Sequence, residues 1–239
     1  MTSELGLIAF PSRAALAARL ADVIEPTLAR AVASRGRAAL ALSGGSTPGD
    51  LHRNLATRAL DWSRTTATLV DERWVPPDDD ASNERLARET LLRERAADAA
   101  CLGLWSDAAS PAAGAAAAND RLADLWAGGG LDAVVLGMGP DGHTASWFPH
   151  ADGLADALEG DAPRVCAVRA RKSAVTGDNL DRLTLNLAAV ASARLVCLMI
   201  AGAEKRDAFE AALGDGAVED QPVRAILRAR PDMWVAWAP

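Results

Sequence analysis

The stretch Ala38–Pro48, with the sequence AALALSGGSTP, decides the fold class of this 239-residue chain. Its first five residues, Ala38–Leu42, form an apolar run without alternation, which is typical of a parallel strand buried on both faces. The glycines that follow end the strand, and Thr47 and Pro48 match the cap and the first position of a helix. A buried strand, a tight turn and a helix in this order indicate an α/β fold.

Similar apolar runs recur along the chain, with helical segments between them. The runs that predict further strands are Leu5–Phe10, Ala67–Val70, Leu131–Leu136, Arg164–Val168, Leu195–Ala201 and Met233–Trp237. The repeated order of strand, helix and strand predicts a three-layer αβα fold with a doubly wound, mainly parallel, Rossmann-like sheet. No internal repeat or long polar linker is evident, so we expect one domain over residues 1–239.

The helices between these strands carry start and stop signals. Ser12 can cap a helix with one apolar face, and Pro26 is expected to kink or end that helix. Asn83–Leu92 and Glu204–Leu213 also read as helices. Ala112–Trp126 is expected to be a single helix, because alanine has the highest helix propensity.

The composition excludes several classes of protein. The chain has 32 Asp and Glu against 25 Lys and Arg, a net charge of −7, whereas a general nucleic-acid binder needs a basic field. The longest apolar run, Leu195–Ala203, is far shorter than the about 20 residues of a membrane span, and no signal-peptide pattern opens the sequence. The cysteines, Cys101, Cys166 and Cys197, are odd in number and lack metal-ligand spacing. We therefore expect a cytoplasmic protein with no structural metal.

Four segments with unusual chemistry each follow an expected strand. In an open α/β sheet, ligands bind at the carboxyl ends of the strands, so these segments should meet at one edge. The first is the loop of Ser43, Gly44, Gly45, Ser46 and Thr47. Its backbone N–H groups at a helix N-terminus can cradle a phosphate, and a plain tight turn is the alternative. The loop lacks the lysine of a Walker A motif and the last glycine of a nucleophile elbow.

The second segment places charged side chains after the strand that ends at Val70. Asp71 and Glu72 together with Arg73 could orient a polyhydroxylated ligand, and Arg73 could bind an anion or an oxyanion. A cluster of surface ion pairs is the alternative interpretation.

The third and fourth segments carry the most reactive groups. The stretch 137–146, GMGPDGHTAS, contains His143, and an imidazole is the preferred general acid or base near pH 7. Asp141 could orient it. In the fourth segment, Lys205 falls in the first turn of an expected helix, where the macrodipole disfavours a cation unless an anion is bound. Lysine occurs elsewhere only at position 172, so a lysine at this place indicates a functional charge.

Five motifs occur in one order along most of the chain: LSGGSTP (42–48), DERWVPP (71–77), GMGPDGHTAS (137–146), RLTL (182–185) and GAEK (202–205). In this combination the chain resembles the family of 6-phosphogluconolactonases and their relatives, the glucosamine-6-phosphate deaminases. One departure lies between Lys172 and Arg182, where this chain lacks the proline-rich stretch that family members often have.

The resemblance implies hydrolysis of 6-phospho-D-glucono-1,5-lactone to 6-phosphogluconate in the pentose phosphate pathway, without a metal or another cofactor. It implies that His143 is the catalytic base and that Arg73 binds substrate. It also implies that the Ser43–Thr47 loop, Arg182 and Lys205 contact the sugar phosphate.

The expected partner is therefore a small sugar-phosphate lactone, with no nucleic acid and no membrane. We expect a monomer, and a homodimer is the alternative. Two other functions remain open. One is an enzyme that isomerises and deaminates an amino-sugar phosphate, and the other is a non-catalytic sugar-phosphate sensor. A sensor of the repressor type would need an attached DNA-binding helix-turn-helix, for which the chain leaves no room.

Overall fold

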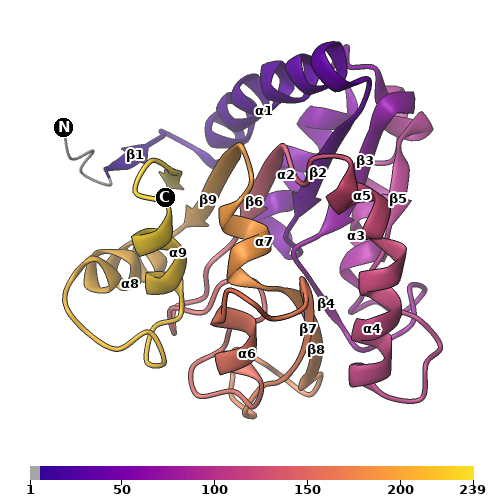
Figure 1. Cartoon of the computed structure of the whole chain (residues 1–239). Helices are drawn as coiled ribbons and strands as arrows, with labels where there is room; N and C mark the ends of the chain where they lie inside the picture. Colours follow the sequence, from indigo (N-terminus) through magenta and orange to yellow (C-terminus); the bar gives the residue numbers. More distant parts are fainter. Residues whose placement is uncertain (1–5) are drawn as a thin grey trace.

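The computed structural model describes residues 6–239, apart from the side chain of Ser46. In this part of the chain a seven-stranded parallel sheet has the strand order β1-β10-β9-β6-β2-β3-β5 (Figure 1). Its strands are β1 (Leu7–Ala9), β2 (Ala38–Leu42), β3 (Thr65–Leu69), β5 (Ala100–Leu102), β6 (Ala133–Leu136), β9 (Leu195–Ala201) and β10 (Trp234–Ala238). From β2 the chain runs through β3 to β5 at one edge and then returns to β6 on the other side of β2. The strand order thus reverses between β2 and β6, which is where open α/β sheets bind ligands.

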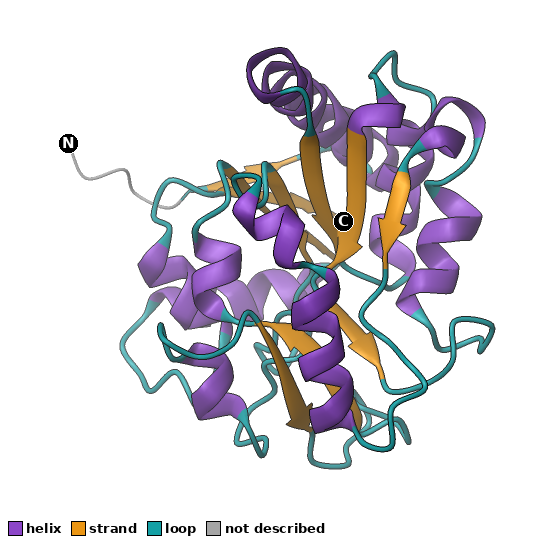
Figure 2. Cartoon of the chain, turned by 45° about the vertical axis from the view of Figure 1, so that its right-hand side comes forward, coloured by secondary structure: helices purple, strands orange, loops and turns teal. Residues whose placement is uncertain are grey.

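Helices cover both faces of this sheet (Figure 2). One face carries α1 (Arg13–Arg35) and α2 (Ser46–Ala56), and the other carries α4 (Pro111–Arg121), α5 (Ala123–Ala127), α7 (Leu187–Ala191), α8 (Ala203–Leu213) and α9 (Val223–Ala229). In β2, Leu40 and Leu42 belong to the hydrophobic core on the α1 side, whereas Ala39 and Ala41 belong to the core on the opposite side. This division explains the continuous apolar run and confirms the predicted three-layer αβα fold.

The remaining helices lie at the margins. The helix α3 (Asn83–Thr90) contacts α2 and β4, and α6 (Leu154–Leu158) packs on β7. Short 3-10 helices span Trp62–Arg64 and Glu94–Asp98. Among the described residues, no helix is long and apolar enough to span a membrane. The expected strand Leu5–Phe10 is present as β1, and its first residue, Leu5, lies outside the described residues.

Pro26 does not end α1, although an end of the helix was one of the two outcomes expected of it. The helix begins after Ser12, whose side chain accepts a hydrogen bond from the Ala15 N–H, and it continues to Arg35. A proline inside a helix costs about 3 kcal/mol. However, the helix buries four large side chains that bracket the proline, Leu16, Leu20, Ile24 and Leu28. Each contributes about 1.5–3 kcal/mol, so together they outweigh the cost and keep the helix intact.

Two helix predictions were wrong in detail. The helix α2 starts at Ser46 with Gly45 as its N-cap, so Thr47 is not the cap, and no side chain caps this end. The region Ala112–Trp126 forms α4 and α5 instead of one helix, with Leu122 between them. The alanine-rich composition indicated helix but contained no signal for this break.

A smaller antiparallel sheet has the order β4-β8-β7 and lies below the large sheet in the view of Figure 1. It contains β4 (Asp71–Arg73), β7 (Val165–Arg169) and β8 (Asp181–Leu185). The prediction of a parallel strand at Arg164–Val168 was therefore wrong. The strands β7 and β8 are joined by a loop without a crossover helix, and such a connection requires an antiparallel pair. The expected polar loop after Val70 is likewise a strand, β4, paired with β8.

Candidate active site

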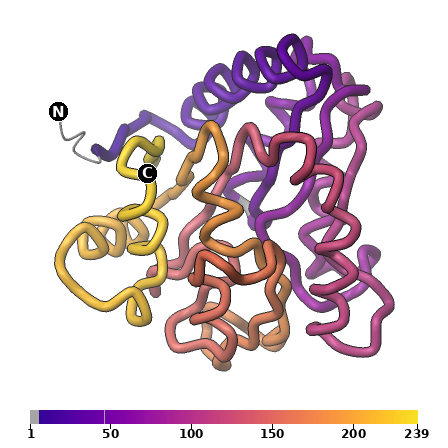
Figure 3. The backbone as a smooth tube through the Cα atoms, viewed as in Figure 1, coloured from indigo at the N-terminus to yellow at the C-terminus, as the bar shows by residue number. Residues whose placement is uncertain are grey.

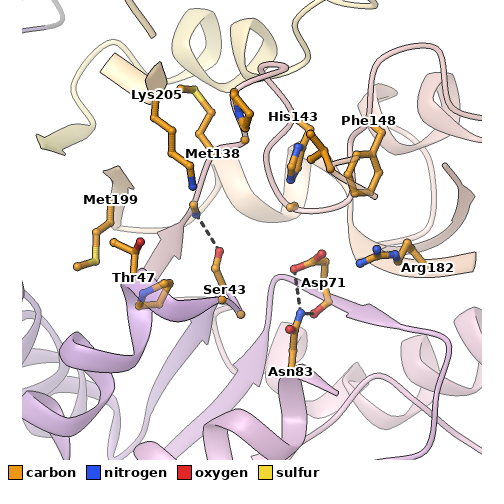
Figure 4. A pocket seen from close by; sticks show the side chains of 18 of the residues that line it. Ser43, Thr47, Asp71, Asn83, Met138, His143, Phe148, Arg182, Met199 and Lys205 are labelled. Carbon is orange, nitrogen blue, oxygen red and sulfur yellow. Dashed lines mark hydrogen bonds between the residues drawn. The ribbon is translucent and has the colours of Figure 1, made fainter. Parts of the chain in front are cut away.

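The four polar segments meet as predicted at the carboxyl edge of the large sheet. The strands β2, β6 and β9 are neighbours, and the tube in Figure 3 shows these sequence-distant segments, each in its own colour, running side by side. Together with β4 and β8 they enclose a pocket of about 290 Å³ (Figure 4). The predicted site residues that line it are Ser43, Gly44, Gly45, Thr47, Asp71, Arg73, His143, Arg182 and Lys205. Asp141 lies behind His143, and the side chain of Ser46 is outside the described part of the chain.

The imidazole of His143 is anchored by Asp141. The Nδ1 atom lies 2.6 Å from Asp141 Oδ1, and the same oxygen accepts the backbone N–H of His143 at 3.2 Å. Burial alone would raise the pKa of the Asp141 carboxyl, but the hydrogen bonds and charge of His143 bring it below its ordinary value. An ionised Asp141 accepts the Nδ1 proton, so Nε2 is the nitrogen that remains to take a proton from water.

Gly139 makes room for this pair. A Cβ atom at position 139 would overlap both His143 Nδ1 and Asp141 Oδ1. The glycine is thus required for the close approach of the loop backbone to the imidazole, which explains its place in the GMGPDGH sequence.

The loop after β2 is held by its own side chains. The hydroxyl of Ser43 donates to Val135 O at 3.0 Å and accepts the Gly137 N–H at 2.9 Å, so it ties this loop to the one after β6. Gly45 adopts φ 97° and leaves the first turn of α2 without a side-chain cap. The free N–H groups and the positive end of the helix dipole favour an anion at this place.

Lys205 reaches the same end of the pocket from α8 (Figure 4). Burial lowers the pKa of its ammonium group, and nearby Arg13 lowers it further. Within residues 6–239 no carboxylate forms an ion pair with Lys205. A half-buried cation at a helix N-terminus is unfavourable, and a bound anion would reverse this.

Two arginines come from the small antiparallel sheet. Arg73 in β4 lies directly opposite Arg182 in β8, and both line the pocket. Arg182 donates to the carbonyl oxygens of Thr176 and Asn179 at 3.2 and 2.7 Å. The Nε of Arg73 is buried and has no partner among the described residues. Neither guanidinium is in an ion pair within the described part of the chain, so both remain available to a ligand anion.

Burial lowers the pKa of Arg182 to about 10, although the Asp71 carboxylate opposes this effect. Asp71 itself is buried and accepts hydrogen bonds from Ser146 Oγ at 2.6 Å and from Asn83 Nδ2 at 3.3 Å. Its carboxylate is thereby fixed in the pocket wall. Asn83 also faces Gly44, where a Cβ would overlap the amide.

The side chain of Glu72 does not line the pocket. The expectation that it helps to orient a ligand was therefore wrong. Its fully buried carboxylate accepts hydrogen bonds from Ser82 Oγ and from the N–H groups of Asn83 and Glu84. Burial raises its pKa to about 7, and these hydrogen bonds oppose that rise. Glu72 therefore anchors the start of α3. A surface ion-pair cluster, the alternative, is excluded by the burial of Asp71 and Glu72.

Several residues of the pocket wall were not predicted individually as site residues. Gly137, Met138, Pro140 and Ala145 lie within the segment 137–146 that was expected at the site, whereas Asn83, Phe148, Val175 and Met199 lie outside the four expected segments. Phe148 is the most informative, because its ring touches both His143 and Arg182. Its place two residues beyond the GMGPDGHTAS stretch was the only available signal.

The other histidines lie outside the pocket. His52 is buried in α2 with Nδ1 2.9 Å from Thr90 Oγ1, and His150 lies 3.0 Å from Asp220. No cluster of three or more His, Cys, Asp or Glu side chains suited to a metal occurs in residues 6–239. The expectation of a metal-free reaction stays a prediction.

Comparison with known proteins identifies the family to which the chain is similar. The family described as "Glucosamine-6-phosphate isomerases/6-phosphogluconolactonase" matches residues 11–237. A 6-phosphogluconolactonase of Rhizobium meliloti is 44% identical over 232 residues, which cover 96% of this chain and 97% of that protein. One of Pseudomonas aeruginosa is 41% identical over 242 residues, covering 100% and 97%. The crystal structure of a 6-phosphogluconolactonase from Shewanella baltica superimposes with a TM-score of 0.91 at 38% identity, and the match covers 100% of both chains.

Proposed function

The chain belongs to the glucosamine-6-phosphate isomerase/6-phosphogluconolactonase family, and on this premise we propose that it hydrolyses 6-phospho-D-glucono-1,5-lactone to 6-phospho-D-gluconate. The observation that carries the proposal is the Asp141–His143 pair beside a pocket whose cations, Arg73, Arg182 and Lys205, form no ion pair within the described residues. A base and an anion-binding wall are what a phosphorylated lactone requires. The reaction would belong to the oxidative pentose phosphate pathway.

In the proposed mechanism, His143 acts as the general base. Its Nε2 takes a proton from a water molecule as that water attacks the lactone carbonyl carbon, while Asp141 holds Nδ1 and stabilises the imidazolium. The tetrahedral intermediate then collapses, the bond to the ring oxygen breaks, and the imidazolium returns its proton to that oxygen. The steps balance without a covalent intermediate or a metal ion.

The remaining site residues bind the substrate. We assign the phosphate to the N-terminus of α2 with its Ser43–Thr47 loop, to Lys205 and to Arg182, because neither side chain forms an ion pair in the described part of the chain. Arg73 stabilises the oxyanion or binds the sugar beside it.

The test is a lactone-hydrolysis assay on the purified protein. The lactone is generated in situ, 6-phosphogluconate is measured through a coupled dehydrogenase, and the spontaneous rate is subtracted. We expect saturable turnover far above the spontaneous rate. A rate equal to the spontaneous one, with correctly folded protein, would exclude the proposal.

A further inference from the structure

Phe148 occupies a fixed position in the pocket wall. Phe148 is only 4% exposed, and the two residues before it are both anchored to the small antiparallel sheet, in which Asp71 pairs with Thr184. Trp147 Nε1 donates to Leu185 O at 2.9 Å, and Ser146 Oγ donates to Asp71 at 2.6 Å. Buried hydrogen bonds of its neighbours thus hold the backbone that carries Phe148, and close burial limits the space in which its ring can move.

This one ring contacts two of the proposed functional groups. The His143 and Phe148 ring centroids are 4.4 Å apart with the planes tilted by 34°. The Arg182 guanidinium carbon lies 5.4 Å from the Phe148 centroid, over the ring. Figure 4 shows Phe148 beside His143, with the guanidinium of Arg182 next to the same ring.

The contact between Phe148 and His143 restricts a motion of the imidazole that its hydrogen bond to Asp141 allows. The hydrogen bond to Asp141 holds Nδ1 but leaves the ring free to tilt about that bond. Contact with an aromatic face restricts the plane of the imidazole, and so it directs Nε2. In addition, the imidazolium that forms during the reaction and the Arg182 cation both contact the Phe148 ring, and the negative face of an aromatic ring favours a cation.

We propose that Phe148 is a positioning residue that sets the orientation of both His143 and Arg182. The inference rests on the proposed function, in which these two groups act as base and phosphate ligand. It predicts that the aromatic face, rather than apolar bulk alone, supports turnover and anion binding together.

The experiment compares Phe148→Leu, which keeps apolar volume, with Phe148→Tyr, which keeps the ring. We expect Phe148→Leu to lower kcat roughly 3- to 30-fold and to weaken 6-phosphogluconate binding roughly 3- to 10-fold, the factors expected for lost aromatic and cation–π contacts. Phe148→Tyr should stay within about 3-fold of the wild type in both, since it retains the aromatic face. Binding is measured by calorimetry, independently of turnover.

The control is Trp62→Leu, which removes a buried aromatic ring from the core on the α1 side, away from the pocket. It should lower the melting temperature but leave kcat and the affinity for 6-phosphogluconate near wild type. Two results would overturn the inference: a folded Phe148→Leu variant with wild-type kcat and affinity, or a Phe148→Tyr variant as impaired as Phe148→Leu. Turnover by the wild type in the same assay tests the proposed function separately.

Discussion

At the scale of single residues, the proposed reaction depends on the imidazole of His143. Alanine at this position cannot take a proton from water, so we expect His143→Ala to lower kcat by roughly 10²–10⁴, the usual contribution of a general base. KM should change little, because the phosphate contacts remain. The spontaneous opening of the lactone must be subtracted. Near-normal kcat in the variant would remove His143 from the mechanism.

The two lysines of the chain provide a matched pair of variants. Lys205 lines the pocket without an ion-pair partner among the described residues, whereas Lys172 is exposed and pairs with Asp178 at 2.7 Å. We expect Lys205→Ala to weaken 6-phosphogluconate binding by about 1.5–3 kcal/mol, the loss of one charge-assisted contact.

Lys172→Ala should bind 6-phosphogluconate like the wild type, since its exposed ion pair is worth little. Calorimetric titration of both variants makes the comparison. If both variants lose the same affinity for 6-phosphogluconate, the overall charge governs binding. If both keep the wild-type affinity, the phosphate binds elsewhere.

Several site residues could be predicted from the sequence because their positions follow from strand ends. Ser43 directly follows β2, and His143 lies in the loop that follows β6. Parallel neighbours carry such loops to one edge of the sheet. Asn83 and Phe148 could not be placed in this way. They reach the pocket through the packing of α3 and of an irregular loop, which a local pattern does not encode.

At the scale of elements, α2 carries a buried histidine that should make stability depend on pH. Thr90 Oγ1 donates to Leu86 O at 2.6 Å, so it accepts from Nδ1 of His52 at 2.9 Å. The His52 Nε2 is then the unprotonated nitrogen, and it is buried without a partner in the described structure. Burial, followed by the charge of Arg53, lowers the pKa of His52 to about 4.

The sign of the effect follows from proton uptake. As pH falls from 6.5 towards 4, the unfolded chain protonates His52 while the folded chain does not, so the free energy of unfolding decreases. In His52→Leu this contribution is absent. We expect the loss of stability between pH 7 and pH 4.5 to be smaller in the variant by about 2–3 kcal/mol. Urea unfolding at both pH values measures it, and identical losses in variant and wild type would contradict the assignment.

The elements themselves were predictable to different degrees. Buried parallel strands such as β2 and β9 show as continuous apolar runs, and their positions agree with the prediction. The segment of β7 has a similar composition but belongs to the antiparallel sheet. An apolar composition indicates that a strand is buried, but it does not indicate which strand it pairs with or in which direction. The helix continues past Pro26 for a related reason, because the local cost of a proline does not include the tertiary burial of α1.

At the scale of the whole molecule, the pocket favours the lactonase over the deaminase alternative. Isomerisation with deamination needs two proton-handling groups, whereas lactone hydrolysis needs one that takes and returns a proton. Beside His143 the pocket wall presents the ring of Phe148. The next carboxylate along the chain after Asp141 is that of Asp152, which is exposed and does not line the pocket. Asp71 does line the pocket, but it is held by Ser146 and Asn83.

We therefore expect no significant release of ammonia or fructose 6-phosphate from glucosamine 6-phosphate. The measurement uses the same protein preparation that is assayed on the lactone. Turnover comparable to that on the lactone would move the function to a deaminase.

The pairing of β2 with β6 and of β6 with β9 also governs when a newly made chain becomes active. Leu40 pairs with Ala133, and Val135 pairs with Cys197, so the pocket exists only after two long loops have closed. Loop closure of this kind is a slow step in folding. Recovery of activity after dilution from denaturant should thus report the last stage of refolding. For the same reason a nascent chain should remain inactive on the ribosome until Lys205 has emerged.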